Sequence, residues 1–569
     1  VLATRLVERT GPWLVELLPV DWSLTADVLN GAGRIEFHHL TIVGRALTAL
    51  FDLGTVLFTF LLGRRLYNPA VGLLAAALLA VAVLHIQLSH FFTSDPYLTF
   101  FVVAAIYFMV AAHEPRDPER TSYPNRQQIY LALAAVMVGL AIGSKFTAVL
   151  LGLPLLWTVW GISSAGNGWR WMAAAIAIAG LTFAVTNPFA LLDWTCLPGS
   201  SGSVPGSITN ALSRSCYLQN VLTQNAMVRG QIDLGFTRQY DGTMPYLYYI
   251  EMLLRWGLGL FLGVLSLIGL GWAVAVGVRS TSSNTQSDGA LAGLRNQPVV
   301  TVLLWVLPYL ILTGSFYVKF MRYLQPAVPF MVLFGAAMLW HWRSAVGRYT
   351  VAFAVLTASS LYAISFNNLY GDEHPWNAAS RWIYENVPTG TMILSEQWDD
   401  YLPVPLTIGE DRRIRSEYPN AELTWLTYPD AADSEENLMA NLELLAGSDY
   451  LTILSNRVYG VVPRQPERFP LSGRYHQLLF DGALGYELAW VGGRSPKLFG
   501  FNLRADTFGW PGLRPPGEVS DYLTQNGGLS LGRADESFIV YDQPLTMIFR
   551  NEGRLSAEQM LAVFAAAGD

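Results

Sequence analysis

Charged side chains at the borders of apolar runs are the residues of this sequence best suited to chemistry. Asp95 stands in HFFTSDPYLTFF, Lys145 in GLAIGSKFTAVLLGLPLL, and Lys319 and Arg322 in YVKFMRYLQPAVPF. Lysine and arginine bind phosphate through charge-assisted hydrogen bonds and stabilise it as a leaving group. We therefore predict that Lys145, Lys319 and Arg322 bind a phosphate, and Asp95 lies at the same outer boundary, where its carboxylate can face a cleft.

Each of these residues also has a purely structural interpretation. Ser94-Asp95-Pro96 is typical of a helix start, with an acidic N-cap and proline as the first helical residue. A lysine near the end of a membrane span can extend to the interface without any further role. The sequence alone leaves both alternatives open.

A polar stretch at 225–259 is a second candidate for ligand binding. It contains Arg229, Arg238, Gln239 and Tyr240, which we predict to bind substrate, because aromatic rings with polar neighbours can stack on a sugar. Tyrosine and tryptophan also anchor proteins at membrane interfaces, and composition does not separate the two roles.

Two further pairs are interpreted as structural. Arg45 and Asp52 lie seven positions apart in one apolar run, so two helical turns place them on one face. We interpret them as an internal ion pair, with each other or with residues of other spans. Cys196 and Cys216, 20 positions apart, would pair in an oxidising compartment, a constraint worth about 3 kcal/mol; the alternative is two unrelated thiols.

The elements that must position these residues are membrane helices. The 569 residues are 52% hydrophobic and only 14% charged, against roughly 25% charged in soluble proteins. A helix needs roughly 20 apolar residues to cross a bilayer. Ten such runs predict a helical, polytopic membrane domain over 41–368, at about 41–63, 70–89, 95–112, 127–144, 146–163, 170–187, 254–278, 299–316, 323–341 and 349–367.

Basic residues in the connections predict the orientation of this domain. One alternating set of short loops is rich in arginine, and the opposite set contains only Lys145, Lys319 and Arg322, so the first set is expected to face the cytoplasm. We therefore expect a multi-pass protein of the plasma membrane. Its extracytoplasmic parts are the loops 1–40 and 188–253 and the tail 369–569. The arginines of the first set are Arg64, Arg65, Arg116, Arg120, Arg126, Arg170, Arg279, Arg295, Arg343 and Arg348.

The tail is predicted to be a separate soluble domain. Residues 370–569 carry 28 acidic and 15 basic residues, a net charge of −13, whereas the rest of the chain carries +6. Short apolar runs alternate with helical stretches there, which predicts an α/β or α+β domain. The overall charge of −7 argues against a nucleic-acid partner.

Several stretches together resemble a known family. GRALTALFDLGTVLFTFLLGRRLYNPAVGLLAAALLA, SHFFTSDPYLTFFVVAAIYF, TNPFALLDW and VKFMRYLQPAVPF are similar, in order and spacing, to bacterial family 39 glycosyltransferases of the protein O-mannosyltransferase-like group. The resemblance implies a GT-C helical bundle. It also implies transfer of a mannose-like hexose from a polyprenyl-phosphate lipid to a protein, glycan or lipid acceptor outside the cell, without a cofactor or metal.

The resemblance also assigns roles to individual residues. The second outside-loop acid of the family corresponds to Asp95, which implies that Asp95 is catalytic. The family's basic residues at the outer face correspond to Lys145, Lys319 and Arg322. The family's general base follows a first span that precedes the first loop, and Asp21, Asp27 and Glu36 match no catalytic position. We therefore expect a fragment that has lost this first span and is inactive by itself.

Two other classes of protein remain as alternatives. A secondary transporter would have inverted repeats, Gly/Pro-broken helices and charges near the midplane. The sequence shows no repeat in the spans, and its charges gather at the outer boundary. A non-catalytic membrane scaffold is the other alternative.

Overall fold

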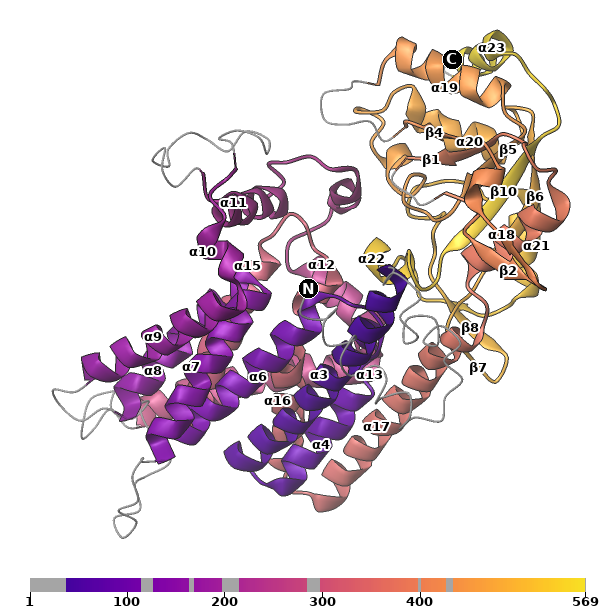
Figure 1. The fold of residues 1–569 in the computed structure, drawn as a ribbon. Helices are drawn as coiled ribbons and strands as arrows, with labels where there is room; N and C mark the ends of the chain where they lie inside the picture. The colour runs from indigo at the N-terminus through magenta and orange to yellow at the C-terminus, as the bar shows by residue number, and fades with distance from the viewer. Residues whose placement is uncertain are drawn as a thin grey trace.

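The computed structural model describes residues 37–113, 126–162, 168–196, 214–283, 297–397, 401–425 and 433–567. Figure 1 shows a bundle of long helices with a C-terminal domain at one end of it. The first described helix begins at Phe37, so residues 1–36 of the predicted first loop lie outside the described residues.

All ten predicted apolar runs form helices, some of them interrupted. The predicted outside loop 188–253 contains short helices of its own. The elements of this first part are α3 (Phe37–Leu66), α4 (Pro69–Ala80), α5 (Val83–Ser89), α6 (Ser94–Ala112), α7 (Arg126–Ser144), η1 (Phe146–Leu151), α8 (Gly152–Ile162), α9 (Gly168–Thr186), α10 (Pro188–Leu192), α11 (Cys216–Val228), η3 (Gly235–Tyr240), α12 (Leu247–Met252), the π-turn η4 (Leu253–Gly257), α13 (Gly259–Ser283), α15 (Pro298–Gly314), η5 (Met321–Leu324), α16 (Val328–Trp340) and α17 (Ala345–Asn367).

Six helices in the described residues are long and apolar enough to cross a membrane, and the pair α4–α5 would be a seventh span. That pair is bent by 60°, so the apolar run predicted at 70–89 forms a broken helix. The runs at 146–162, 298–314 and 328–340 form shorter apolar helices. The protein is thus a mostly helical, multi-pass membrane protein, as predicted.

The bend between α4 and α5 brings a polar side chain to the C-terminal domain. Gln87 on α5 is buried, and its side-chain nitrogen donates to the backbone oxygen of Phe538 (2.7 Å) and to Oδ2 of Asp542 (2.8 Å). A buried amide needs such partners, because leaving it without hydrogen bonds is costly. The bend therefore gives the Gln87 amide partners outside the membrane bundle.

The C-terminal domain combines a mixed sheet with surrounding helices, which confirms the predicted α/β or α+β class. Its main sheet has the order β4-β1-β5-β10-β6, in which β1 is parallel to β4 and β5, and β10 is antiparallel to β5 and β6. The principal elements are α18 (Pro375–Asn386), β1 (Ile393–Glu396), β2 (Leu406–Ile408), β3 (Asp411–Arg413), β4 (Asn420–Leu423), α19 (Glu435–Ala446), β5 (Tyr450–Ile453), α20 (Tyr475–Phe480), β6 (Tyr486–Gly493), β7 (Lys497–Leu498), β8 (Phe501–Arg504), α21 (Gly517–Gln525), β9 (Leu529–Ser530), α22 (Glu536–Ile539), β10 (Leu545–Asn551) and α23 (Ala557–Ala566).

The short helix α22 joins this domain to the bundle. Phe538 and Ile539 are buried in the same apolar core as the membrane helices. The Phe538 ring centroid lies 5.8 Å from that of Trp256 and 5.6 Å from that of Phe366. The two parts therefore share a core instead of meeting only through polar surfaces.

Glycines allow two bundle helices to approach closely. A Cβ atom added at Gly269 of α13 would overlap the backbone of Gly335 on α16, and α16 is buried along most of its length. A Cβ atom added at Gly271, on the same helix, would meet nothing within 4 Å.

We therefore expect Gly269→Ala to destabilise the bundle, because the clash is with backbone and the helices must separate. Overpacking of this kind costs about 1–3 kcal/mol, so the melting temperature in detergent should fall by several degrees. Gly271→Ala is the matched control, with the same gain in helix propensity and no clash. Equal melting temperatures for the two variants would contradict the close packing of α13 on α16.

Candidate functional site

The carboxylate of Asp95 is the buried centre of the candidate site. α6 begins at Ser94 after the N-cap residue Thr93, so the predicted N-cap role of Asp95 is wrong. The Asp95 side chain is 4% exposed and makes ion pairs with residues of other elements. A buried charge is costly unless it is paired, so these partners are required for the local structure.

Two cations approach Asp95 from the ends of other elements. Lys145 follows α7 directly, and its Nζ lies 2.8 Å from Oδ1 of Asp95. Arg322 lies on η5, and its Nε is 3.9 Å from Oδ2. Each carboxylate oxygen therefore faces a cation. The fold brings together three residues that the sequence analysis selected from positions far apart in the chain.

Aromatic rings lie against both cations. The Lys145 nitrogen is 4.1 Å from the ring centroid of Tyr323, and the Arg322 guanidinium is 4.6 Å from that of Phe320, distances at which a cation is attracted to a ring face. The side chains of Lys145 and Arg322 remain 26% and 37% exposed. Two partly accessible cations held by one buried carboxylate can bind an anion such as phosphate.

Lys319 lies in a different environment from Arg322. It is buried, and its Nζ donates to the backbone oxygen of Tyr317 (2.9 Å) and to Oγ1 of Thr243 (3.1 Å). These hydrogen-bond partners are neutral, whereas Arg322 pairs with Asp95. Burial lowers the pKa of Lys319 to about 8. A shared phosphate site for Lys319 and Arg322 stays a prediction.

Gln239 and Tyr240, two of the predicted substrate-binding residues, contact the C-terminal domain. The Gln239 side-chain oxygen accepts from the backbone N–H of Glu536 (3.1 Å). The hydroxyl groups of Tyr240 and Tyr248 donate to Oδ2 of Asp535, at 3.1 and 2.8 Å. Burial raises the pKa of Asp535, and these hydrogen bonds oppose that shift. Asp535 thus links the C-terminal domain to the 225–259 stretch. The sequence did not predict this role, because Asp535 lies in no recognisable motif and its partners are almost 300 positions away.

Arg238 is buried between the loop and the C-terminal domain. Its guanidinium donates to both oxygens of Asp233, at 2.8 and 2.9 Å, and Asp233 also pairs with Arg468 of the C-terminal domain. The backbone oxygen of Arg238 accepts from the side chain of Gln465 (3.1 Å). Arg229, at the end of α11, is exposed. Substrate binding by these residues remains a prediction, and Arg229 is the most accessible of them.

Of the two predicted arrangements for Arg45 and Asp52, the structure gives Asp52 a partner on another helix and does not pair the two residues with each other. Asp52 lies 2.7 Å from Nδ1 of His85 on α5, and this histidine is buried. Arg45 is exposed on the same helix as Asp52. The bend between α4 and α5 places a polar partner from another helix beside Asp52, which the spacing within one helix does not reveal.

Cys196 and Cys216 form the predicted disulfide. The bond joins the segment after α10 to the first residue of α11. No metal centre is found in the described ranges: within them, no three His, Cys, Asp or Glu side chains are grouped to hold an ion.

A family model covers the part of the chain that contains Asp95 and Lys145. Residues 37–192 match the model of the dolichyl-phosphate-mannose-protein mannosyltransferases, which confirms the resemblance noted from the sequence motifs. No curated protein matches the chain.

Solved structures of low sequence identity are similar to parts of this chain, with TM-scores below 0.5. The oligosaccharyltransferase of Archaeoglobus fulgidus, in complex with zinc and sulfate, is 15% identical with a TM-score of 0.44, over 79% of this chain and 61% of that one. ArnT from Cupriavidus metallidurans, bound to undecaprenyl phosphate, is 15% identical with a TM-score of 0.35, over 58% and 54%. The chain therefore spans less than two thirds of the length of either protein. AglB from A. fulgidus, in complex with an inhibitory peptide and a dolichol-phosphate, is 11% identical with a TM-score of 0.48, over 92% and 79%.

The buried position of Lys319 leads to a pH-dependent stability. Below about pH 8, Lys319 holds its proton in both the folded and the unfolded chain. Between about pH 8 and 10.5, the folded protein releases this proton while the unfolded chain keeps it, so the free energy of unfolding rises with pH. We expect the melting temperature of the wild type to rise over this interval relative to that of Lys319→Met. A difference between the two proteins that does not change with pH would contradict the burial of a titrating Lys319.

Proposed function

We propose that this protein is a membrane glycosyltransferase that moves a mannose-like hexose from a polyprenyl-phosphate lipid to a protein, glycan or lipid acceptor. The single observation that carries the proposal is the contact of both Asp95 carboxylate oxygens with cations, Lys145 and Arg322. The match of residues 37–192 to a mannosyltransferase family supports the reaction class and the choice of sugar.

In this proposal, Lys145 and Arg322 bind the donor phosphate. The acceptor oxygen attacks the anomeric carbon, the bond from that carbon to the phosphate oxygen breaks, and the acceptor's proton passes to a general base. The polyprenyl phosphate leaves with the bonding electrons, and the two cations stabilise its added negative charge. Asp95 acts as a positioning residue, because both of its oxygens are engaged by these cations.

The position of the cations at the end of the bundle fits a lipid donor. Asp95 is at the start of α6, Lys145 at the end of α7, and Arg322 just before α16. A phosphate held at such a boundary leaves its isoprenoid chain in the apolar region of the bilayer. The positive-inside rule places this end of the bundle, and the C-terminal domain with it, outside the cytoplasm.

We expect Arg322→Met and Lys145→Met each to weaken the binding of a short-chain polyprenyl phosphate. Hydrogen bonds to charged groups contribute about 1.5–3 kcal/mol, so affinity should fall roughly 10- to 100-fold. Ligand-induced thermal stabilisation in detergent measures this affinity and does not depend on catalysis. Arg343→Met, which removes an exposed arginine from the loop between α16 and α17, is the matched control.

Unchanged affinity in both site variants would refute the phosphate site. Transfer from a polyprenyl-phosphate hexose should fall in parallel with binding. Uptake of substrate into proteoliposomes without a glycosylated product would favour a transporter instead.

The positioning role of Asp95 predicts a non-additive effect. Asp95→Asn should raise the KM for the lipid donor more than it lowers kcat, because the cations lose the group that orients them. If Asp95 acts through Arg322, the double variant Asp95→Asn/Arg322→Met should bind donor little worse than Arg322→Met alone. Additive losses would assign Asp95 a direct contact with substrate.

A further inference from the structure

A small three-stranded sheet of the C-terminal domain has one polar and one apolar face. β7 pairs with β8 in an antiparallel hairpin, and β8 pairs in parallel with β9, with Leu503 opposite Leu529 and Arg504 opposite Ser530. Successive side chains of a strand point to opposite faces. Phe501 and Leu503 therefore share one face of β8, and Asn502 and Arg504 share the other.

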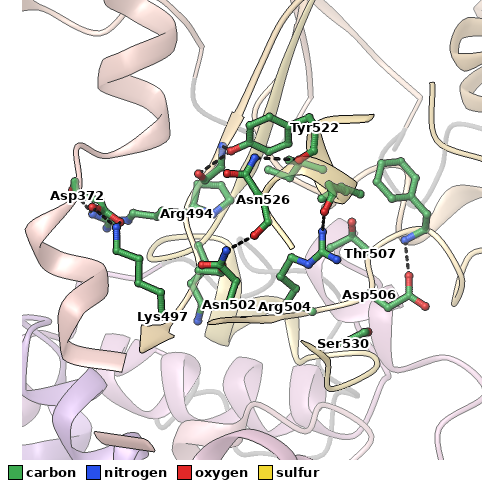
Figure 2. A pocket seen from close by; sticks show the side chains of 18 residues that line it. Asp372, Arg494, Lys497, Asn502, Arg504, Asp506, Thr507, Tyr522, Asn526 and Ser530 are labelled. Carbon is green, nitrogen blue, oxygen red and sulfur yellow. Dashed lines mark hydrogen bonds and ion pairs between the residues drawn. The ribbon is translucent and has the colours of Figure 1, made fainter. Parts of the chain in front are cut away.

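The two faces border two different cavities. Asn502, Arg504 and Ser530 line a polar cavity of about 500 Å³, where Figure 2 shows them together with other polar side chains. Leu503 and Leu531 line a second, largely apolar cavity of about 570 Å³. The sheet thus separates a polar compartment from an apolar one.

The apolar cavity lies between this sheet and membrane helices. Its lining includes Phe261, near the start of α13, and Tyr362, on α17. Arg255 of η4 donates to the backbone oxygen of Leu531 (3.2 Å), which holds the end of β9 against the bundle. The apolar face of the sheet is therefore continuous with the surface of two helices in the membrane domain.

Large apolar side chains extend this face without any cover from the described residues. Phe499 is 88% exposed, Phe501 71% and Leu529 61%. Phe499 occupies the turn of the hairpin with a φ of 50°, a conformation that is unfavourable for an aromatic residue. Gly500, the second residue of the turn, also has a positive φ, as a two-residue hairpin of this kind requires, so the turn places the Phe499 ring at the exposed tip of the hairpin.

The hairpin is held beside the C-terminal end of α17. α17 ends at Asn367, and the side chain of the next residue, Asn368, donates to the backbone oxygen of Lys497 (3.0 Å). Lys497 also forms an ion pair with Asp372. Since two residues span at most about 7 Å of extended chain, Phe499 lies close to the C-terminal end of α17. Figure 1 shows β7 and β8 on the side of the C-terminal domain nearest to the end of α17.

We infer that the β7–β8 hairpin inserts Phe499 and Phe501 into the lipid bilayer beside α17, together with Leu529 of β9. The partner is lipid, because the exposed residues continue an apolar face that already borders membrane helices, and because the hairpin is held at the end of α17, one of the helices long and apolar enough to cross a membrane. The anchor holds the C-terminal domain at a constant height above the bundle. It is independent of the donor site.

The test uses a polarity-sensitive NBD fluorophore attached to Phe499→Cys in the full chain. The two natural cysteines are joined in a disulfide, so without a reductant only the introduced thiol reacts. The labelled protein is reconstituted in vesicles of phosphatidylcholine and phosphatidylglycerol, with and without phosphatidylcholine that carries a doxyl quencher near the headgroup end of an acyl chain. Glu558→Cys, exposed on α23 at the far end of the C-terminal domain, is the matched control.

An inserted hairpin gives blue-shifted emission at position 499 and loss of more than half of the fluorescence with doxyl lipid, while position 558 keeps a water-like spectrum and is not quenched. Water-like emission without quenching at position 499 would overturn the inference. Blue-shifted emission without doxyl quenching would also overturn it, because a protein surface would then cover the hairpin. Matching melting temperatures of the two labelled proteins show that both are folded.

Discussion

The burial of the Asp95 carboxylate is the constraint on which the candidate site depends. A buried charge without a partner is so unfavourable that the ends of other elements must supply cations to it. Lys145 comes from the turn after α7 and Arg322 from the turn before α16. The same interaction therefore closes one end of the bundle and concentrates positive charge there. An anion that binds at this place meets cations that are already oriented, so little conformational entropy is lost on binding.

The C-terminal domain is positioned by a second buried carboxylate. Asp535 accepts hydrogen bonds from Tyr240 and Tyr248, and the next helix, α22, places Phe538 in the core of the bundle. This arrangement accounts for Gln239 and Tyr240 in the polar stretch 225–259, whose side chains contact the other domain. A loop rich in arginine, glutamine and tyrosine can serve an interface between domains as well as a substrate.

A small sheet of the C-terminal domain separates two cavities of different polarity. The strands β8 and β9 present Asn502, Arg504 and Ser530 to a polar cavity, and Leu503 to an apolar one beside the membrane helices. Successive side chains of a strand point to opposite faces of a sheet, so a few residues are enough to line both cavities. In the proposed membrane anchor, this sheet of a few residues lies at the boundary between water and lipid.

The sequence by itself determined which secondary structure each part of the chain forms and which types of residue make up the candidate site. Apolar runs and their lengths are local properties, so the helical membrane domain, the separate tail domain with its sheet and the pairing of Cys196 with Cys216 were predictable. Asp95, Lys145 and Arg322 could be selected because charges are rare in and beside the apolar runs and therefore stand out. Only the tertiary structure decided which charges meet: His85 rather than Arg45 beside Asp52, and neutral oxygens rather than a carboxylate around Lys319. The physical reason is that pairing depends on helix bends and on contacts between residues up to hundreds of positions apart, which no local pattern of the chain records.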